Sequence, residues 1–442
     1  MLYGCLLIVG LPLLLVVLIV LLVVGREASG KRQLQDKIAA LKAAGMPFDS
    51  DSLQQYYQQQ TDPQHTQRWL SALKTLSSQE LQQSALGVPQ FDGKVQSDVP
   101  LPDQVWDEPT ETATRKFLEQ WRNLHQEIYE LSLHAKPVRF PINFDGVDTT
   151  LTHVQEMRQA ARLLNLKGKV ALRDNDSAEV GRAIEGMLGM THVLTADAFI
   201  VSQLVVIAID GISLNLLKDG LHSDVLQPAE LRKFLPSVLA QIEIGDTWRT
   251  GMIGERAFAL PTFNNTVQVV GATIPGRSRD ALLYLEFSQR AIELPTENLD
   301  EFRAAAQRLE YDLQQGIRSS LLRQLDSIMT SALIPAYSAT ADAHVRRAVQ
   351  HRLAAIAIGL RLFEQQHGQF PASLAELSQL ELGLEQLGPA VGKSFGYRVD
   401  SRGMAQVWSH NQREPGDAIP PQPYDTSDPE SNNAMWVWEL KP

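Results

Sequence analysis

An uninterrupted apolar segment at the N-terminus constrains this chain more than any other feature. The stretch from Leu2 to Val24 contains no charged side chain and consists mainly of Leu, Val and Ile. A helix needs roughly 20 apolar residues to cross the hydrocarbon core of a bilayer, whereas the apolar part of a cleaved signal peptide has about 7–15. No basic region precedes the segment, and it ends in Val-Gly-Arg-Glu without a small-residue cleavage site. We therefore predict a single-pass membrane protein held in the lipid bilayer by residues 2–24.

The charges that flank this segment leave its orientation open. None of the basic residues nearby precedes it; those that follow are Arg26, Lys31, Arg32 and Lys37. By the positive-inside rule these residues favour a cytoplasmic location for the remainder of the chain. Glu27 and Asp36 lie among them, however, and large domains can cross a membrane despite such charges.

Composition narrows the classes of function. The 442 residues are 44% hydrophobic and 21% charged, which is ordinary for globular domains, and they suffice for two or three domains. The formal net charge is −11 and no Lys/Arg-rich block stands out, which argues against nucleic acid as a partner. Cys5, inside the apolar segment, is the one cysteine. Intrachain disulfides, Cys metal clusters and thiol active sites are therefore excluded.

Apolar residues spaced three and four positions apart predict a succession of helices after the anchor. The expected ranges are 32–44, 65–82, 112–133, 153–172, 177–190, 199–217, 228–242, 279–292, 298–315 and 317–333. The most hydrophobic is Phe199 to Leu217, but its apolar run is short for a membrane span and Asp210 would be costly in lipid. We expect it to be the central helix of a buried bundle. Residues 86–110 are dense in Pro, Gly and Asp and predict a break between structural units.

A further helix is predicted near the C-terminus, where one apolar face recurs at helical spacing. This face consists of Val349, Leu353, Ile356, Leu360 and Phe363. Gly368 follows the last turn, where a left-handed cap is least costly, and Pro371 prevents the helix from resuming. Ser373 and Glu376 have capping-box spacing, which predicts a second, short helix.

The remaining tail differs in composition and predicts a small sheet. Residues 395–399 and 404–408 read as a β-hairpin, and residues 435–440 as a third strand. The predicted fold class is therefore mainly α, with an N-terminal transmembrane helix, a multi-helix body and a small C-terminal α+β module. The domain boundaries that we expect are an anchor at 1–25, a helical segment and linker at 26–110, the helical body at 111–340 and the α+β tail at 341–442.

The internal stretch most typical of a functional site is residues 248–258. Glu255 beside Arg256, after Gly251 and Gly254, could act as a general acid or base next to a cation. The alternative, which we favour, is an ion pair or buried hydrogen bond between helices, because no second carboxylate or histidine stands at a recognisable spacing. Histidines that folding could bring near Glu255 are His134, His153 and His192.

A partial calcium-loop pattern begins at Asp174. Asp176 and Glu185 fall at the third and twelfth positions of an EF-hand loop, but Ala178 and Glu179 occupy the fifth and sixth, where a ligand and a glycine belong. We therefore interpret the acidic residues as a helix cap. On these grounds the sequence assigns no catalytic, cofactor-binding or metal-binding residue, and it predicts no cofactor.

The tail resembles the soluble head of type II secretion pseudopilins. The residues that carry the resemblance are Gly368, Pro371, Leu374, Leu377, Gly392, Lys393, Tyr397, Arg398, Val407, Trp408 and Ser409. It implies a long helix followed by a small antiparallel sheet, and a soluble part outside the cytoplasm. Unlike in a pseudopilin, the helix is internal, and no Gly precedes a Phe-Thr-Leu-x-Glu motif. In calcium-binding pseudopilins a late loop supplies acidic ligands; Asp425, Asp428 and Glu430 lie in a comparable loop here, where solvated carboxylates are the favoured alternative.

The whole chain is also similar to a group of uncharacterised bacterial proteins with an N-terminal anchor, a helical middle and this tail. The matching stretches are 136–141, 202–208, 254–257 and 334–336. This resemblance implies a membrane-anchored envelope protein but no activity.

These observations support three hypotheses about function. The favoured one is a membrane-anchored, extracytoplasmic interaction or scaffold protein with protein partners in the envelope and no evident catalytic site. The second is an accessory component of a type II secretion or pilus-like system. The third is an envelope enzyme that uses Glu255 and a histidine, although the sequence contains no HExxH or GxSxG motif.

Overall fold

The computed structural model describes the chain from residue 25 onward, with gaps. The described residues are 25, 27–58, 62–95, 98–134, 138–142, 149–194, 197–264, 266–269, 272–275, 278–320, 323–324, 327–334, 336–384, 387, 395–409 and 437–441. The predicted membrane anchor at residues 2–24 and the acidic loop at Asp425 lie outside them. Residues 27–43 are helical, which confirms the helix expected directly after the anchor.

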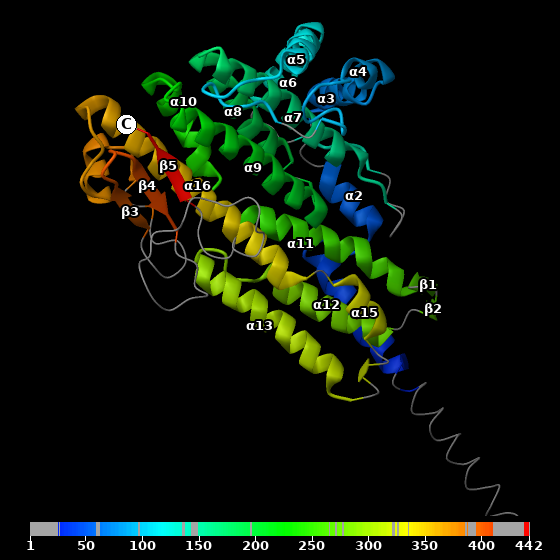
Figure 1. Cartoon of the computed structure of the whole chain (residues 1–442). Helices are drawn as coiled ribbons and strands as arrows, with labels where there is room; N and C mark the ends of the chain where they lie inside the picture. Colours follow the sequence, from blue (N-terminus) through cyan, green and yellow to red (C-terminus); the bar gives the residue numbers. More distant parts are fainter. Residues whose placement is uncertain are drawn as a thin grey trace, which may run out of the picture.

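The described part of the chain is mainly helical, as the sequence predicted, and Figure 1 shows how its helices are arranged. Its first half comprises α2 (Ser50–Gln58), α3 (Pro63–Leu76), α4 (Gln79–Ser84), α5 (Glu108–Gln120), α6 (Arg122–Ser132), α7 (Thr152–Arg173), α8 (Ser177–Leu194) and α9 (Ile200–His222). Its second half comprises α10 (Pro228–Ala240), α11 (Gly245–Ala259), η2 (Leu260–Asn264), α12 (Ser278–Ile292), α13 (Leu299–Arg318), α15 (Ile328–Leu333), α16 (Tyr337–His367) and η3 (Leu374–Leu380). Strands β1 (Thr266–Val269) and β2 (Ala272–Pro275) form an antiparallel hairpin between η2 and α12.

Helix α9 is the centre of the body. It packs against α7, α8, α11 and α16, and most of its side chains are buried (Figure 1). Among the described residues, α9 is the helix whose length and apolar composition would suffice to cross a membrane, but 61% of its most apolar stretch is buried inside the protein. A helix that is hydrophobic on all sides belongs in a core, so the expectation of a central helix is confirmed.

A buried ion pair joins α9 to α16. The Nε of Arg347 on α16 donates to the Asp210 carboxylate on α9, and both side chains are 2% exposed. The His351 Nε2 lies 3.4 Å from the other Asp210 oxygen, and Arg347 also donates to Gln241 after α10. Burial opposes ionisation of Asp210, but Arg347 and His351 together outweigh it and hold the pKa of Asp210 below its ordinary value.

Helix α16 ends where the sequence predicted. Gly368 has a φ of 73°, the left-handed conformation that glycine adopts without strain, and its N–H bonds to the carbonyl of Glu364. The Ser373–Glu376 capping box also forms. The segment that it starts, η3, is a 3₁₀ helix and not an α-helix, and it ends at Glu381 in a left-handed turn.

The C-terminal sheet forms as expected and packs against α16. β3 (Gly396–Val399), β4 (Ala405–Trp408) and β5 (Val437–Leu440) pair in that order, antiparallel throughout. Arg361, which is buried on α16, connects this sheet to the body: its Nη2 donates to the backbone carbonyl of Leu221 at the end of α9 and to that of Lys441 after β5. The end of the described chain is thereby tied to the central helices.

Several predicted helix boundaries were wrong, because the helices break at positions through which the apolar pattern continues. The range 65–82 is divided into α3 and α4 at Ser78, whose side chain accepts from the N–H of Leu81 and starts a new helix. The range 112–133 is divided into α5 and α6 at Trp121. Of the range 317–333, α13 includes only the first residues and α15 only the last six.

We predict that Arg361→Leu destabilises the protein and releases β5. The substitution leaves the backbone carbonyls of Leu221 and Lys441 without their donor, which should cost roughly 2–4 kcal/mol in the free energy of unfolding. Amide hydrogen exchange at residues 438–440 should accelerate more than exchange in α7. Arg346→Leu, at an exposed position of the same helix, is the matched control and should change stability by less than about 0.5 kcal/mol. Equal effects of the two substitutions would contradict this role for Arg361.

Candidate functional site

The stretch that the sequence singled out lies on α11, where this helix meets the chain just before α9. Gly254 is pressed against Ala198: a Cβ added to it would overlap the backbone carbonyl oxygen of Ala198. A glycine is therefore required here by the close approach of two backbones and not by flexibility. This contact brings the next side chain of α11, that of Glu255, against the start of α9.

Glu255 caps α9. Its Oε1 accepts a hydrogen bond of 3.1 Å from the backbone N–H of Ile200, the first residue of that helix, where the helix dipole favours a negative charge. Burial raises the pKa of Glu255, and the bond from Ile200 opposes that effect. The hydroxyl of Tyr284 on α12 donates to the Glu255 backbone carbonyl at 2.9 Å.

The hydrogen-bond partners of Arg256 lie on different elements from those of Glu255. Its Nη1 donates to Gln289 on α12 at 2.6 Å, and its Nη2 donates to the carbonyl of Pro47 at 3.2 Å, so it connects α11 to the segment before α2. The two side chains thus make interhelical hydrogen bonds, which is the alternative that the sequence analysis favoured over acid–base chemistry.

A second polar cluster, which the sequence analysis missed, lies beside this one at the start of α9. The Oδ2 of Asp197 lies 2.7 Å from the Nε2 of His153 on α7 and accepts a 2.7 Å hydrogen bond from Ser202 on α9. The three side chains are at most 5% exposed. The Phe140 ring stacks on that of His153, with 4.7 Å between centroids. Serine and histidine both bond to the same carboxylate oxygen, so the order of contacts differs from that of a Ser-His-Asp triad.

Burial determines how this cluster titrates. Burial raises the pKa of Asp197 to about 7, although the hydrogen bond from Ser202 acts in the opposite direction. Burial also lowers the pKa of His153 to about 4. Between these values the pair holds a single proton in its 2.7 Å hydrogen bond. The unfolded pair, with ordinary values of 3.8 and 6.5, also holds one proton over nearly the same range. The intact pair therefore contributes little pH dependence to stability.

The other candidate histidines lie elsewhere. His134, after α6, stacks on His65 of α3 with 4.0 Å between ring centroids, and its Nε2 is 3.8 Å from Asp62. His192 is exposed on α8. The structure therefore places His134, His153 and His192 in three different environments.

The acidic residues that partly match a calcium loop have structural roles. The two oxygens of Asp174 bind the guanidinium of Arg115 on α5 at 2.8 and 2.9 Å, and Asp176 accepts from the N–H of Glu179 in the first turn of α8. Glu185 bonds to Tyr129 and Lys233. The helix-cap interpretation is thus supported, and within the described residues no group of three or more His, Cys, Asp or Glu side chains is arranged to hold a metal ion.

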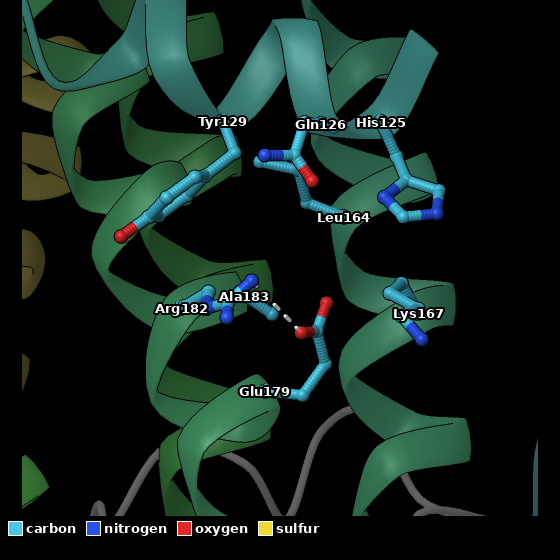
Figure 2. A pocket seen from close by; sticks show the side chains of 8 residues that line it. All are labelled: His125, Gln126, Tyr129, Leu164, Lys167, Glu179, Arg182 and Ala183. Carbon is cyan, nitrogen blue, oxygen red and sulfur yellow. Dashed lines mark ion pairs between the residues drawn. The ribbon is translucent and has the colours of Figure 1, made fainter. Parts of the chain in front are cut away.

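Open hollows lie at the surface, away from both polar clusters. One lies between α6, α7 and α8 and is shown in Figure 2. Another is the groove between α3 and the α5–α6 junction, lined by Gln64, Gln67, Arg68, Ser71, Ala72, Thr75, Gln120, Trp121, Asn123, Leu124 and Glu127. A third lies between the end of α16 and β3, around Phe363, His367 and Phe370.

We predict that Gly254→Ala is strongly destabilising, because the methyl group has no space beside the Ala198 backbone. The expected loss is at least roughly 2 kcal/mol. Gly316→Ala on α13 is the matched control: its added methyl group would meet nothing within 4 Å, and the better helix former should stabilise the protein by roughly 0.5 kcal/mol. Chemical denaturation of both variants measures the difference, and a neutral Gly254→Ala would exclude the close contact.

We also predict opposite pH profiles when either member of the His153–Asp197 pair is replaced. In His153→Gln, Asp197 keeps its raised pKa without a titrating partner. Its contribution is fully favourable below its ordinary pKa of 3.8, and stability falls as pH rises to about 7, by up to roughly 4 kcal/mol.

In Asp197→Asn the sign reverses. His153 is then buried with a lowered pKa, so stability is retained above its ordinary value of 6.5 and falls as pH drops to about 4, by up to roughly 3 kcal/mol. Denaturation midpoints measured between pH 4 and 8 test both profiles. Parallel profiles for the two variants would contradict the single-proton description.

Comparison of the chain with protein-family models, with curated proteins and with solved structures found no match.

Proposed function

We propose that this protein is a membrane-anchored, extracytoplasmic interaction or scaffold protein, held in the bilayer by residues 2–24. The observation that carries this proposal is how the buried charged groups of the body are used. Glu255 caps a helix, Arg256 and Arg361 donate to backbone carbonyls, and Asp210 pairs with Arg347 across two helices. These contacts hold helices together, and none of the five side chains lines the surface hollows described above. A rigid body that offers surface grooves is suited to binding.

The groove between α3 and the α5–α6 junction is the surface best suited to a protein partner. Its floor contains the buried side chains of Ala72 and Leu124, and its rim carries amide and hydroxyl side chains. Such groups match the donors and acceptors of a peptide backbone. Trp121, a residue type that often contributes most to interface energy, lies at one edge and is half-buried. An ion pair from Arg68 to Glu127 crosses between the two helices.

A second candidate function is an accessory role in a secretion or pilus-like system. The observation that favours it is the long helix α16 with the antiparallel β3–β4–β5 sheet packed on it. The Gly368 cap and Pro371 lie in the chain between this helix and the sheet. The hydroxyl of Tyr397 on β3 donates to the Pro371 carbonyl at 2.8 Å and fixes the sheet against the turn. This arrangement supports a pseudopilin-like tail, which would be exposed on the same side of the membrane as the body.

Cysteine labelling in intact cells tests location and groove binding together. In a Cys5→Ser background, Val105→Cys places a thiol at a position that is 95% exposed, and Gln67→Cys places one in the groove. We expect a small membrane-impermeant maleimide to label Val105→Cys in intact cells. Gln67→Cys should react more slowly in cells than in the purified protein, because a bound partner covers it.

Two outcomes would contradict the proposal separately. Protection of Val105→Cys until the cells are lysed would place the body in the cytoplasm. Equal labelling rates of Gln67→Cys in cells and after purification, with Val105→Cys as the rate reference, would show that the groove is unoccupied. Ala161→Cys, at a fully buried position of α7, is the negative control and should stay unlabelled in the folded protein.

A further inference from the structure

The hollow between α6, α7 and α8 brings together basic and polar side chains from three helices (Figure 2). Its lining consists of His125, Gln126 and Tyr129 from α6, Leu164 and Lys167 from α7, and Glu179, Arg182 and Ala183 from α8. Figure 2 shows the His125 ring and Lys167 along one side of the hollow, with Glu179 and Arg182 facing them. The hollow is small, with a cavity volume of about 20 Å³, and it opens to solvent, so the oxygen atoms at one end of a larger molecule could enter it.

The hollow exists because α6 and α8 diverge from a tight contact. At one end of this interface, a Cβ on Gly189 would overlap the carbonyl of Ser132, and a Cβ on Gly186 would press on the Tyr129 ring. These glycines hold the second half of α8 against α6. Nearer the start of α8, the side chains that face α6 are those of Arg182 and Glu179 instead of glycines, and the hollow lies there between the helices. The hollow therefore lies beside a helix contact that is set by backbone packing.

His125 is the most informative residue in the lining. It is only 8% exposed, and within the described part of the chain its ring makes no hydrogen bond. Burial, followed by the positive charges of Lys167 and Arg122, lowers the pKa of His125 to about 4. The ring is thus neutral at pH 7, with an N–H donor that lacks a protein acceptor in a positive local potential.

The charges around His125 are only partly neutralised. Glu179 faces Arg182, with 3.4 Å between the carboxylate and the Nη1, and Arg122 is similarly close to Glu119. Among the described residues Lys167 has no ion-pair partner within 4.0 Å, although Asp174 lies near enough for Lys167 to affect its pKa. The Tyr129 hydroxyl donates to Glu185, which also pairs with Lys233, so these three groups bond to one another and not to a ligand in the hollow. Of the cations described here around the hollow, Lys167 is therefore the one without an ion-pair partner among the described residues.

We propose that the hollow binds an oxyanion, such as a phosphoryl or carboxylate group, between Lys167 and the buried imidazole of His125. Lys167 supplies the positive charge and the imidazole N–H supplies a directed donor. The Gln126 amide donates one hydrogen to Glu130 at 3.1 Å and retains a second one for the ligand. His125 lies in the first turn of α6, where the helix dipole also favours a negative charge.

This site couples anion binding to proton uptake. A bound oxyanion would offset the positive charges of Lys167 and Arg122 that oppose protonation of His125, so it raises the pKa of His125 from its low value. Protonated His125 in turn binds the anion more tightly. The affinity for a given charge state of the oxyanion should therefore increase as pH falls from 7 to 5. Glu179 is the opposing charge in the hollow, and its removal should strengthen binding at every pH.

Titration of the full-length protein in detergent micelles with inorganic phosphate, and separately with acetate, tests the site. The measurements are calorimetry and the NMR signals of the His125 ring between pH 5 and 7.5, at constant ionic strength. We expect saturable shifts of the His125 signals. After correction for the ionisation of phosphate and acetate themselves, we also expect a lower dissociation constant at lower pH. Lys167→Met should weaken binding roughly tenfold, and Glu179→Gln should strengthen it. Binding of phosphate alone assigns a phosphoryl ligand, and comparable binding of acetate assigns a carboxylate ligand.

The controls separate this site from unspecific binding. Lys74→Met removes an exposed lysine in the last turn of α3 and should leave the affinity unchanged. His125→Asn should abolish the pH dependence of binding, provided that the thermal unfolding of this variant remains cooperative. If His125→Asn does not fold, Lys167→Met still tests the site, because Lys167 is partly exposed and its replacement should not disturb folding. Absence of saturable binding by either anion would overturn the proposal. So would equal affinities in the wild-type protein, Lys167→Met and Lys74→Met.

Discussion

The buried pair between Asp210 and Arg347 is the interaction on which the rest of this structure depends. It joins the centre of α9 to α16, and the second bond from Arg347 to Gln241 attaches the end of α10 to the same point. A carboxylate whose side chain is 2% exposed is tolerated only while its cation stays in place, because an unpaired buried charge costs several kcal/mol. This pair therefore helps to fix the position of α16, and of the C-terminal sheet packed on it, relative to α9.

The sequence predicted the fold where one local signal sufficed. The uniform apolar character of Phe199 to Leu217 indicated a central helix, and Gly368 with the Ser373–Glu376 box marked the end of α16. Breaks at Ser78 and Trp121 were missed because the apolar spacing continues through them. Capping by a single side chain or a change in backbone angle ends a helix there, and periodicity does not detect such an event.

The polar clusters were harder to predict, because their members are distant in sequence. Glu255 and Arg256 attracted attention as adjacent charges after glycines, but their roles follow from Ile200 and Pro47, which are 55 and 209 positions away. Asp197 carried no signal of its own, since an aspartate before an apolar helix is typical of a cap. Only the fold brings His153, 44 positions earlier, to its carboxylate. The one usable hint was His153 on a helix that is otherwise largely apolar on its buried side.

The polar contacts along α9 also explain why a core helix carries so many charged neighbours. A helix that is apolar on every side has no preferred rotation or axial position within a bundle, because many placements bury similar area. Here Asp197, Ser202 and Glu255 bond at its start, Asp210 pairs at its middle, and Arg361 binds the Leu221 carbonyl at its end. Each bond is satisfied in one placement only. We infer that these groups contribute to structural specificity more than to stability, as a buried polar residue fixes register in a coiled coil.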